Sequence, residues 1–502
     1  MAEHPEPFQD LNWEPARARR FGDRVLDLWE EFLAKLPDMP VTSRQFTETA
    51  VHDAVVIPVP DEPLPEDELV DYMRSIWFDY SMYPGHPRFS AYVTAAGTVP
   101  GVVADMAAAA MNQNLGAWRL SPAASEIESA MTAWFAQRFG LPAETAGGLI
   151  VTGGAMANFV ALKAARDAMA GWDVRTLGVT AGQPLAIYAS EEVHVVIDRA
   201  ADMMGLGTNA VRKIPVDERF RMRADVLELR IEEDLRAGVR PIVVVGTAGT
   251  VATGSIDPLP TIADLCERHG MWFHVDAAYG GPATLADDLR PLFAGIERAD
   301  SIAFDPHKWI YTPQSGGCVV VRDLQKLSDS FAVNPTYVHS DRRKTGHGLD
   351  LRDLGPQFSR GFSAFKVWIS LLAHGREAYS KRISHDAELA RYLGARVEER
   401  EDFELAAPVS LSTCCFRYVP PDLGDHVVRE EYLSMLNERI LIELQLDGRV
   451  YCSNAVLDGR FVLRSCIVNF RTEAEDLDAL LDVAAELGER FDREIRPASM
   501  RV

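Results

Sequence analysis

Short β-rich runs alternate with helical segments between residues 86 and 385, and this alternation limits the fold more than any other feature of the chain. It predicts a mainly parallel sheet with helices on its faces, because each parallel connection needs a crossover that returns the chain to the same end of the sheet. The last run can pair antiparallel, since it follows its predecessor after a short turn. The predicted strands are 148–152, 185–188, 241–246, 271–275, 301–304 and 317–321, and the predicted helices between them include 157–169, 195–204 and 259–269.

The two ends of the chain carry different patterns, which predict a division into three parts. Residues 1–85 have helical patterns at 16–36 and 65–80, and we expect this segment to pack on a partner subunit because it is too short for a core of its own. After a long helical region, residues 386–502 mix strands and helices and predict a small α+β domain. The large domain is then 86–385. In the last part the expected strands are 411–417 and 461–468, and the expected helices are 430–444 and 477–491.

Composition excludes several classes of protein. The formal net charge of -23 over 502 residues argues against binding to nucleic acid or to an anionic membrane surface. The chain has no charge-free apolar stretch of about 20 residues and begins without the basic and apolar regions of a signal peptide, so we expect a cytoplasmic protein. The six cysteines show no metal-ligand spacing, so we expect them to be reduced and mostly buried and expect no metal site.

Two polar residues follow predicted strands and carry the strongest functional signal. Asp276 ends the apolar run 271–275, and Lys308 follows the run 301–304. Either residue alone would usually be a surface or capping group, but both should emerge at the carboxyl edge of one sheet, where open α/β folds bind ligands. An amine and a carboxylate there suit pyridoxal 5′-phosphate (PLP): the amine forms a Schiff base with its aldehyde, and the carboxylate keeps its pyridine nitrogen protonated. The pair therefore predicts a PLP enzyme that acts on amino acids.

Other residues near predicted strand ends could complete such a site. Gly153 and Gly154 lie between a strand and an alanine-rich helix, where unpaired backbone N–H groups can bind a phosphate, although a Gly-Gly pair alone is more often a turn. His194 follows the run 185–188 and could cover one face of the pyridine ring, or it could simply cap or pack its helix. On the other face a small residue is needed, and Ala278 fits.

Several segments together resemble the PLP-dependent group II amino-acid decarboxylases, which include the aromatic-L-amino-acid, tyrosine, histidine and glutamate decarboxylases. The most specific are His-Val-Asp-Ala-Ala-Tyr at 274–279 and Asp-Pro-His-Lys-Trp at 305–309, and the similarity extends from residue 86 to residue 472. The resemblance implies PLP fold type I (aspartate aminotransferase-like), with a mainly parallel seven-stranded sheet in the large domain. It also implies a homodimer with active sites at the subunit interface.

The resemblance assigns roles to individual positions. It implies that Lys308 is the Schiff-base lysine, Asp276 the pyridinium partner, His194 the stacking residue and Ala278 the residue beneath the ring. His307, Ala155 and Met156 would contact the phosphate. Because the family often has a hydroxyl where this chain has Ala155, the phosphate would depend more on backbone amides and on other hydroxyls, such as that of Thr250.

The same resemblance bears on the product of the reaction. Tyr337, in Asn-Pro-Thr-Tyr at 334–337, matches a tyrosine that the family carries on a mobile loop and uses to protonate Cα. In some relatives a phenylalanine at this position diverts the reaction to an aldehyde, ammonia and peroxide. Tyr337 therefore favours simple decarboxylation to an amine and carbon dioxide.

The substrate is less constrained than the reaction. Ser359 occupies a position at which plant relatives separate phenolic from indolic substrates, so we expect an aromatic amino acid such as tyrosine, dihydroxyphenylalanine, phenylalanine or tryptophan. Gly85 and Gly116 differ from the bulky residues of the animal aromatic enzyme, which leaves an aliphatic or acidic substrate, or an aldehyde product, as alternatives. Another fold-type I enzyme and a catalytically silent binding protein are less compatible with the motifs. The expected pocket residues are Tyr92, Trp118, His194 and Ser359.

Overall fold

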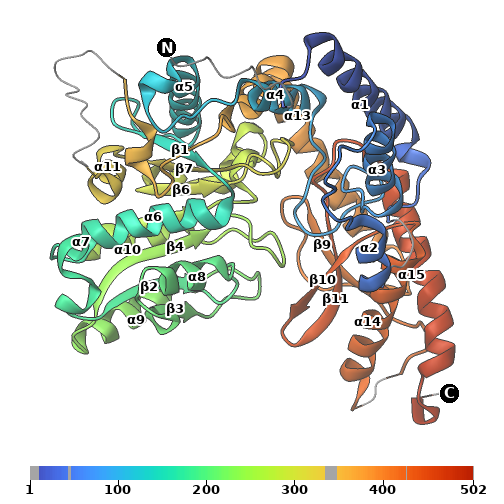
Figure 1. Cartoon of the computed structure of the whole chain (residues 1–502). Helices are drawn as coiled ribbons and strands as arrows, with labels where there is room; N and C mark the ends of the chain where they lie inside the picture. Colours follow the sequence, from blue (N-terminus) through green and yellow to red (C-terminus); the bar gives the residue numbers. More distant parts are fainter. Residues whose placement is uncertain (1–10, 43–46, 334–347, 425–426, 501–502) are drawn as a thin grey trace, which may run out of the picture.

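The computed structural model describes residues 11–42, 47–333, 348–424 and 427–500, and its centre is a seven-stranded sheet (Figure 1). The strand order is β1-β7-β6-β5-β4-β2-β3, and only β7 runs antiparallel to its neighbours. This confirms the predicted α/β class and the antiparallel last strand. The strands are β1 (Gly147–Val151), β2 (Leu185–Ser190), β3 (Val211–Ile214), β4 (Arg240–Thr247), β5 (Trp272–Asp276), β6 (Ser301–Phe304) and β7 (Gly317–Val321).

Strand β3 is the one strand of this sheet that the sequence pattern did not predict. It has four residues at the sheet edge, and the polar side chains of Arg212 and Lys213 separate its two buried residues, Val211 and Ile214. So short and mixed a run gives no β-rich signal. Strands β5, β6 and β7 are buried along their whole length, because helices cover both faces of a mainly parallel sheet.

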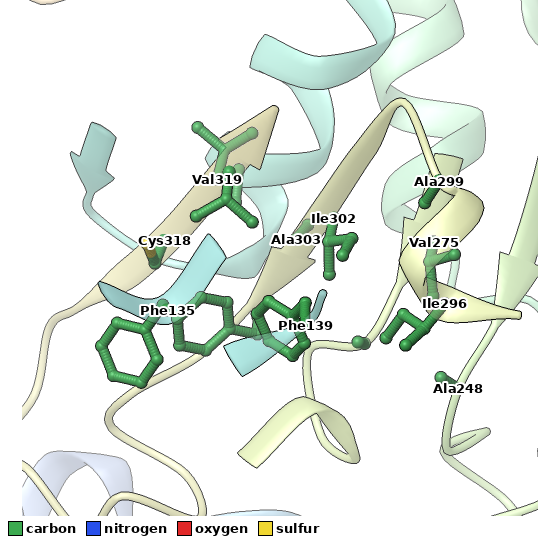
Figure 2. Close-up of a cluster of buried hydrophobic side chains, with 14 of the residues drawn as sticks. Phe135, Phe139, Ala248, Val275, Ile296, Ala299, Ile302, Ala303, Cys318 and Val319 are labelled. Atoms are coloured by element: carbon green, nitrogen blue, oxygen red, sulfur yellow. The ribbon is translucent and has the colours of Figure 1, made fainter. Parts of the chain in front are cut away.

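A large hydrophobic core lies between the sheet and its helices (Figure 2). Phe135 of α5 and Phe139, the residue that follows this helix, place their rings 4.7 and 5.3 Å from that of Phe304, and they pack with Val275 and Ile302 of the neighbouring strands. All six cysteines are buried and free, as predicted. The helices of this region are α5 (Pro122–Arg138), α6 (Gly154–Met169), α7 (Val174–Leu177), α8 (Val196–Met203), α9 (Ala224–Arg236), α10 (Leu259–His269) and α11 (Gln325–Phe331).

A second, four-stranded antiparallel sheet forms the small C-terminal unit, in the order β10-β11-β9-β8. The long helix α13 (Ala364–Glu398), broken at Gly375, packs against both this sheet and the large one's helices. The small sheet has its own core, as expected for an α+β unit. Its elements are β8 (Phe403–Leu405), β9 (Thr413–Tyr418), β10 (Ser453–Leu457), β11 (Arg460–Cys466), α14 (Arg429–Asp447) and α15 (Ala474–Ile495).

The N-terminal helices α1 (Pro15–Lys35) and α3 (Glu66–Asp79) pack on each other and lie beside the C-terminal unit in Figure 1. Helix α3 has no fully buried residue. The short helix α2 (Glu48–Val55) was not predicted, and α4 (Val99–Met111) follows the N-terminal segment. None of the helices in the described ranges combines the length and apolar character needed to cross a membrane. The division into three domains stays a prediction.

Candidate functional site

The carboxyl edge of the large sheet brings together the lysine and carboxylate singled out in the sequence. Asp276 is the last residue of β5 and is 4% exposed. The backbone links it to the lysine segment: the Ala278 amide donates to Asp276 Oδ1 at 3.1 Å, and the Ala278 carbonyl accepts from the Asp305 amide at 3.1 Å. The Lys308 amide in turn donates to the Asp305 carbonyl at 3.0 Å. Asp276 and Lys308 therefore belong to one edge and one hydrogen-bonded framework.

The amine of Lys308 is paired with a carboxylate to which the sequence analysis gave no role. Lys308 Nζ lies 3.0 Å from Asp305 Oδ2. Asp305 is 2% exposed, and its Oδ1 is buried with no hydrogen-bond partner among the described residues. An orphaned carboxylate oxygen in the interior is costly, so this edge contains a polar group whose partner is still to be supplied.

The start of α6 has the features of an anion site. The first-turn amides of a helix cannot all be paired within it, and their dipoles favour a negative charge. Gly317 packs closely on Gly153, because a Cβ at Gly317 would lie 2.4 Å from the carbonyl carbon of Gly153. His307 lies beside Gly153, and its Nδ1 is 2.6 Å from the Gly316 carbonyl oxygen. In the first turn Ala155 is exposed and Met156 is half-buried, with the Met156 amide donating to the Gly153 carbonyl at 3.0 Å.

His194 lies between β2 and α8 and interacts electrostatically with groups at the same edge of the sheet. Surrounding protein atoms desolvate its ring and lower its pKa, although part of the side chain is exposed in the isolated chain. The carboxylates of Asp276 and Asp305 oppose this pKa shift, and the Lys308 ammonium adds to it. The Val196 amide donates to His194 Nδ1 at 3.1 Å, which keeps that nitrogen unprotonated. Four of the site's charged or titratable groups are therefore near enough to interact electrostatically.

Trp309 and Tyr311, which follow Lys308 in the sequence, anchor its segment to the interior. Trp309 Nε1 donates to Asp386 Oδ2 at 2.9 Å, and Tyr311 donates its hydroxyl to the same oxygen at 2.5 Å. Arg382 donates twice to Asp386 Oδ1, at 2.8 and 2.6 Å. We call Trp309, Tyr311, Arg382 and Asp386 the rear network. It ties the lysine segment to α13.

His274 supports the site from within strand β5, two residues before Asp276 and on the same face of the sheet. Its Nε2 is 2.8 Å from Asn158 Oδ1 of α6, and its Nδ1 is 2.8 Å from Ser301 Oγ of β6. Burial lowers the pKa of His274 to about 4, so the imidazole is neutral near pH 7.

The hydroxyls at the end of β4 differ from the sequence-based expectation. Thr250 is fully buried within a turn, where its Oγ1 lies 3.0 Å from Thr253 Oγ1 and accepts from the Ser255 amide at 3.0 Å. Thr247, the last residue of β4 and the register partner of Asp276, has a buried hydroxyl without a partner among the described residues. Thr247 was not predicted from the sequence, although its position at the end of a strand beside Asp276 could have revealed it.

The predicted pocket residues lie on different elements. Tyr92 is 49% exposed, has a left-handed backbone and lies near Tyr451 of the small unit. Trp118 is half-buried, and its amide donates to Asp350 Oδ1 at 2.9 Å. Ser359 is exposed next to the backbone of Gly116, which packs on Phe358. Tyr337 lies outside the described residues.

One further cation lies near Tyr92 and was not predicted. Arg464 of β11 is 2% exposed and donates through Nε to the Ala252 carbonyl at 3.0 Å and through Nη1 to the Tyr92 carbonyl at 3.0 Å. Its Nη2 is buried with no partner among the described residues. Arg464 thus connects the small sheet to the turn after β4 and retains an unused donor.

The residues present fit PLP. The lysine amine and the Asp276 carboxylate belong to one hydrogen-bonded framework, and Thr247 offers an unpaired hydroxyl beside Asp276. The amides at the start of α6, the small residues Gly153 and Gly154 and the imidazole of His307 suit a phosphate. A carboxylate next to a pyridine nitrogen and a primary amine next to an aldehyde are the partners that this cofactor requires.

Comparisons with known proteins agree with this chemistry. A family model described as the pyridoxal-dependent decarboxylase conserved domain matches residues 53–419. An aromatic-L-amino-acid decarboxylase of Bacillus atrophaeus is 30% identical over 469 residues, which cover 93% of this chain and 95% of that protein. A phenylacetaldehyde synthase of Arabidopsis thaliana is 28% identical over 456 residues, or 89% and 91% of the two chains. The solved structure of Oryza sativa TDC with PLP and tryptamine matches with a TM-score of 0.89 at 28% identity, covering 97% and 100% of the two chains.

Proposed function

Because this chain belongs to the pyridoxal-dependent decarboxylases and is a PLP-dependent amino-acid decarboxylase, we propose that its substrate is an aromatic L-amino acid, which it converts to the amine and carbon dioxide. The observation that carries the residue roles below is the convergence of Lys308, Asp276 and His194 at one sheet edge. The substrate class is supported by the relatives, which include an aromatic-L-amino-acid decarboxylase.

Each residue at the edge has a distinct task in this proposal. When bound, PLP supplies an aldehyde that amines can bond and a ring that accepts electrons. Lys308 would hold the cofactor through its amine, and Asp276 would keep a proton on the pyridine nitrogen. His194 covers one ring face with a neutral imidazole, and Ala278 leaves room on the other.

The phosphate is held at the start of α6. Ala155, Met156 and the imidazole of His307 would contact it, and the support for this position is the close packing of Gly153 on Gly317 and His307. Thr247 replaces Thr250 in the proposal, because the Thr250 hydroxyl is already used within its turn while that of Thr247 has no partner among the described residues.

The substrate side chain is received by Tyr92, Trp118, Ser359 and His194, and Tyr337 returns a proton to Cα. Amine formation measured across the twenty amino acids and dihydroxyphenylalanine tests the substrate class. We expect kcat/KM for the best aromatic substrate to exceed that for glutamate by at least about a hundredfold. A preference for glutamate or for an aliphatic amino acid would remove the aromatic assignment and leave the decarboxylase in place.

The proposed role of Tyr337 has its own test. The substitution Tyr337→Phe removes the hydroxyl that is proposed to donate the proton. We therefore expect less amine and more aldehyde, ammonia and peroxide from the same substrate. The ratio of amine to peroxide is measured on matched samples of both proteins. An unchanged ratio would mean that another group protonates Cα.

An acidic amino acid is the second candidate substrate, and one observation favours it. The unused Nη2 of the buried Arg464 could bind a distal carboxylate, because a guanidinium forms its strongest hydrogen bonds with carboxylates. Arg464→Met should then lower kcat/KM for glutamate by about a hundredfold or more and spare the aromatic substrates. An equal loss for both classes would identify Arg464 as a structural residue only.

A homodimer completes the proposal, and a cytoplasmic location remains part of it. Its support is apolar surface on α4, where Val99, Val103 and Met106 lie on one face and are 44–55% exposed. An apolar cavity of about 540 Å³ lies between this helix and α1, and its lining includes Trp29 and Phe32. Sedimentation should show a dimer for the natural protein and a monomer for Val103→Asp.

A further inference from the structure

Asp305 stands at the place where the proposed phosphate and the lysine meet. It follows the last residue of β6, and a Cβ added to Gly154 at the start of α6 would lie 2.7 Å from its Oδ2. The carboxylate is therefore packed against the helix terminus that is proposed to bind the anion. It is 2% exposed, and its Oδ1 has no partner in the described part of the chain.

The groups that face Asp305 show which charge balances its carboxylate in the absence of a ligand. Lys308 Nζ is 3.0 Å from Oδ2, and His307 Nε2 is 3.9 Å from it. His194 interacts with the carboxylate electrostatically, and so does the buried thiol of Cys318 on β7. The Lys308 ammonium is thus the nearest charge that balances the Asp305 carboxylate.

Binding of a phosphate-bearing ligand changes this balance. A phosphate at the start of α6 brings negative charge next to a carboxylate in an environment of low dielectric constant, where like charges repel strongly. A neutral carboxyl group, in contrast, could donate a hydrogen bond from its orphaned oxygen to a phosphate oxygen.

We infer that Asp305 takes up one proton from solvent when a phosphate-bearing cofactor binds, and that the resulting carboxyl group donates a hydrogen bond to the phosphate. The inference rests on the phosphate position given under the proposed function. It makes cofactor loading depend on pH through a residue that does not touch the reacting carbon. Loading is then favoured by acid and opposed by base.

Binding of 4′-deoxypyridoxine 5′-phosphate, which has no aldehyde, isolates this step from chemistry at Lys308. Calorimetry in buffers of different ionisation enthalpy should show that the natural protein takes up about one proton more than Asp305→Asn. As the pH rises from about 7 to about 9, affinity should fall by up to about tenfold per pH unit more in the natural protein than in the variant. At about pH 8 the variant should bind at least about tenfold more tightly.

Asp300→Asn is the matched control, because Asp300 precedes the first residue of the same strand and accepts from the Phe273 amide at 2.8 Å. It should leave proton uptake unchanged. The ³¹P resonance of the bound ligand should be that of a phosphate dianion. Equal proton uptake in the natural protein and Asp305→Asn, or a monoanion resonance, would overturn the inference.

A second ligand separates this inference from the phosphate placement. His307→Gln should weaken binding of the phosphorylated ligand and leave 4′-deoxypyridoxine, which lacks the phosphate, unaffected. If it changes neither, the phosphate lies elsewhere and both ideas fall. If it weakens only the phosphorylated ligand while Asp305→Asn changes nothing, the placement stands and the role of Asp305 is refuted.

Discussion

The segment from Asp305 to Tyr311 contacts two buried carboxylates that differ in their hydrogen bonding. One is Asp305 at its own start, and the other is Asp386 of α13. Behind it, Asp386 accepts four hydrogen bonds, from Trp309, Tyr311 and twice from Arg382. On the side of the sheet edge, Asp305 has one ammonium partner and one oxygen without a partner among the described residues. Both side chains are at most 2% exposed, so burial does not distinguish them.

The difference separates a structural group from one that awaits a ligand. A buried carboxylate whose acceptor sites are filled fixes the positions of its donors, and here those donors flank the lysine. A buried carboxylate with an orphaned oxygen destabilises the ligand-free chain, which is tolerated where binding supplies the missing partner. The predictions below test this contrast, from the largest expected effect to the smallest.

Lys308→Ala tests the side that faces the sheet edge. We expect carbon dioxide release to fall by about a thousandfold or more, because the substitution removes the amine that is proposed to hold the cofactor. The visible absorbance of the purified protein should disappear with it. Lys381→Ala, at an exposed lysine that pairs with Glu377, is the control and should change neither. Native-rate carbon dioxide release by Lys308→Ala would refute the assignment.

Asp386→Ala tests the rear network. It leaves the half-buried Arg382 cation without its carboxylate and deprives two aromatic donors of their acceptor, so we expect a loss of about 3 kcal/mol in the free energy of unfolding. Denaturant unfolding measures this loss. Asp287→Ala, at an aspartate that is 82% exposed beside Arg376, should change stability by less than about 0.5 kcal/mol. Equal effects of the two substitutions would show that Asp386 does not stabilise the fold.

The sequence predicted the residues at the sheet edge but not the contacts of Asp386 behind them. Asp276 and Lys308 could be found because one ends an apolar strand and the other follows the end of such a strand within four residues, and the parallel sheet brings such positions to one edge. The Asp386 contacts could not be found, because they join a long helix to a loop far away in the sequence by side-chain geometry alone. Pairing of this kind leaves no periodic signal.

The failures at single residues have similar causes. Thr250 was expected to help hold the phosphate because this chain has Ala155 where the family often has a hydroxyl, and the structure shows its hydroxyl hydrogen-bonded within a tight turn. Asp305 was visible within a specific motif, but its orphaned oxygen is a property of packing and not of residue type. The sequence therefore locates groups along strands better than it determines which of them remain unsatisfied.

His274 should make stability depend on pH from beneath the site. Burial lowers its pKa to about 4 in the folded state, against an ordinary value of 6.5, so the unfolded chain binds more protons between these two values. The stability that the neutral imidazole contributes is fully present above about pH 6.5. It is lost as the pH falls, and the loss reaches about 3 kcal/mol near pH 4. His274→Gln, which cannot titrate, should show a shallower loss of stability over this range. Parallel curves for both proteins would exclude a neutral buried imidazole.

Ser359 should have the smallest effect, because it lies exposed at the proposed pocket and touches neither buried carboxylate in the proposal. Ser359→Gly should shift the ratio of kcat/KM for tyrosine over tryptophan by about three- to tenfold toward tryptophan, since it removes a hydroxyl and adds space. Ser359→Ala keeps Cβ and loses only the hydroxyl, so comparing the two variants separates polarity from volume. Both should retain the unfolding free energy of the natural protein within about 0.5 kcal/mol. A change in the total rate without a change in the ratio would place Ser359 outside the pocket and confine specificity to other residues.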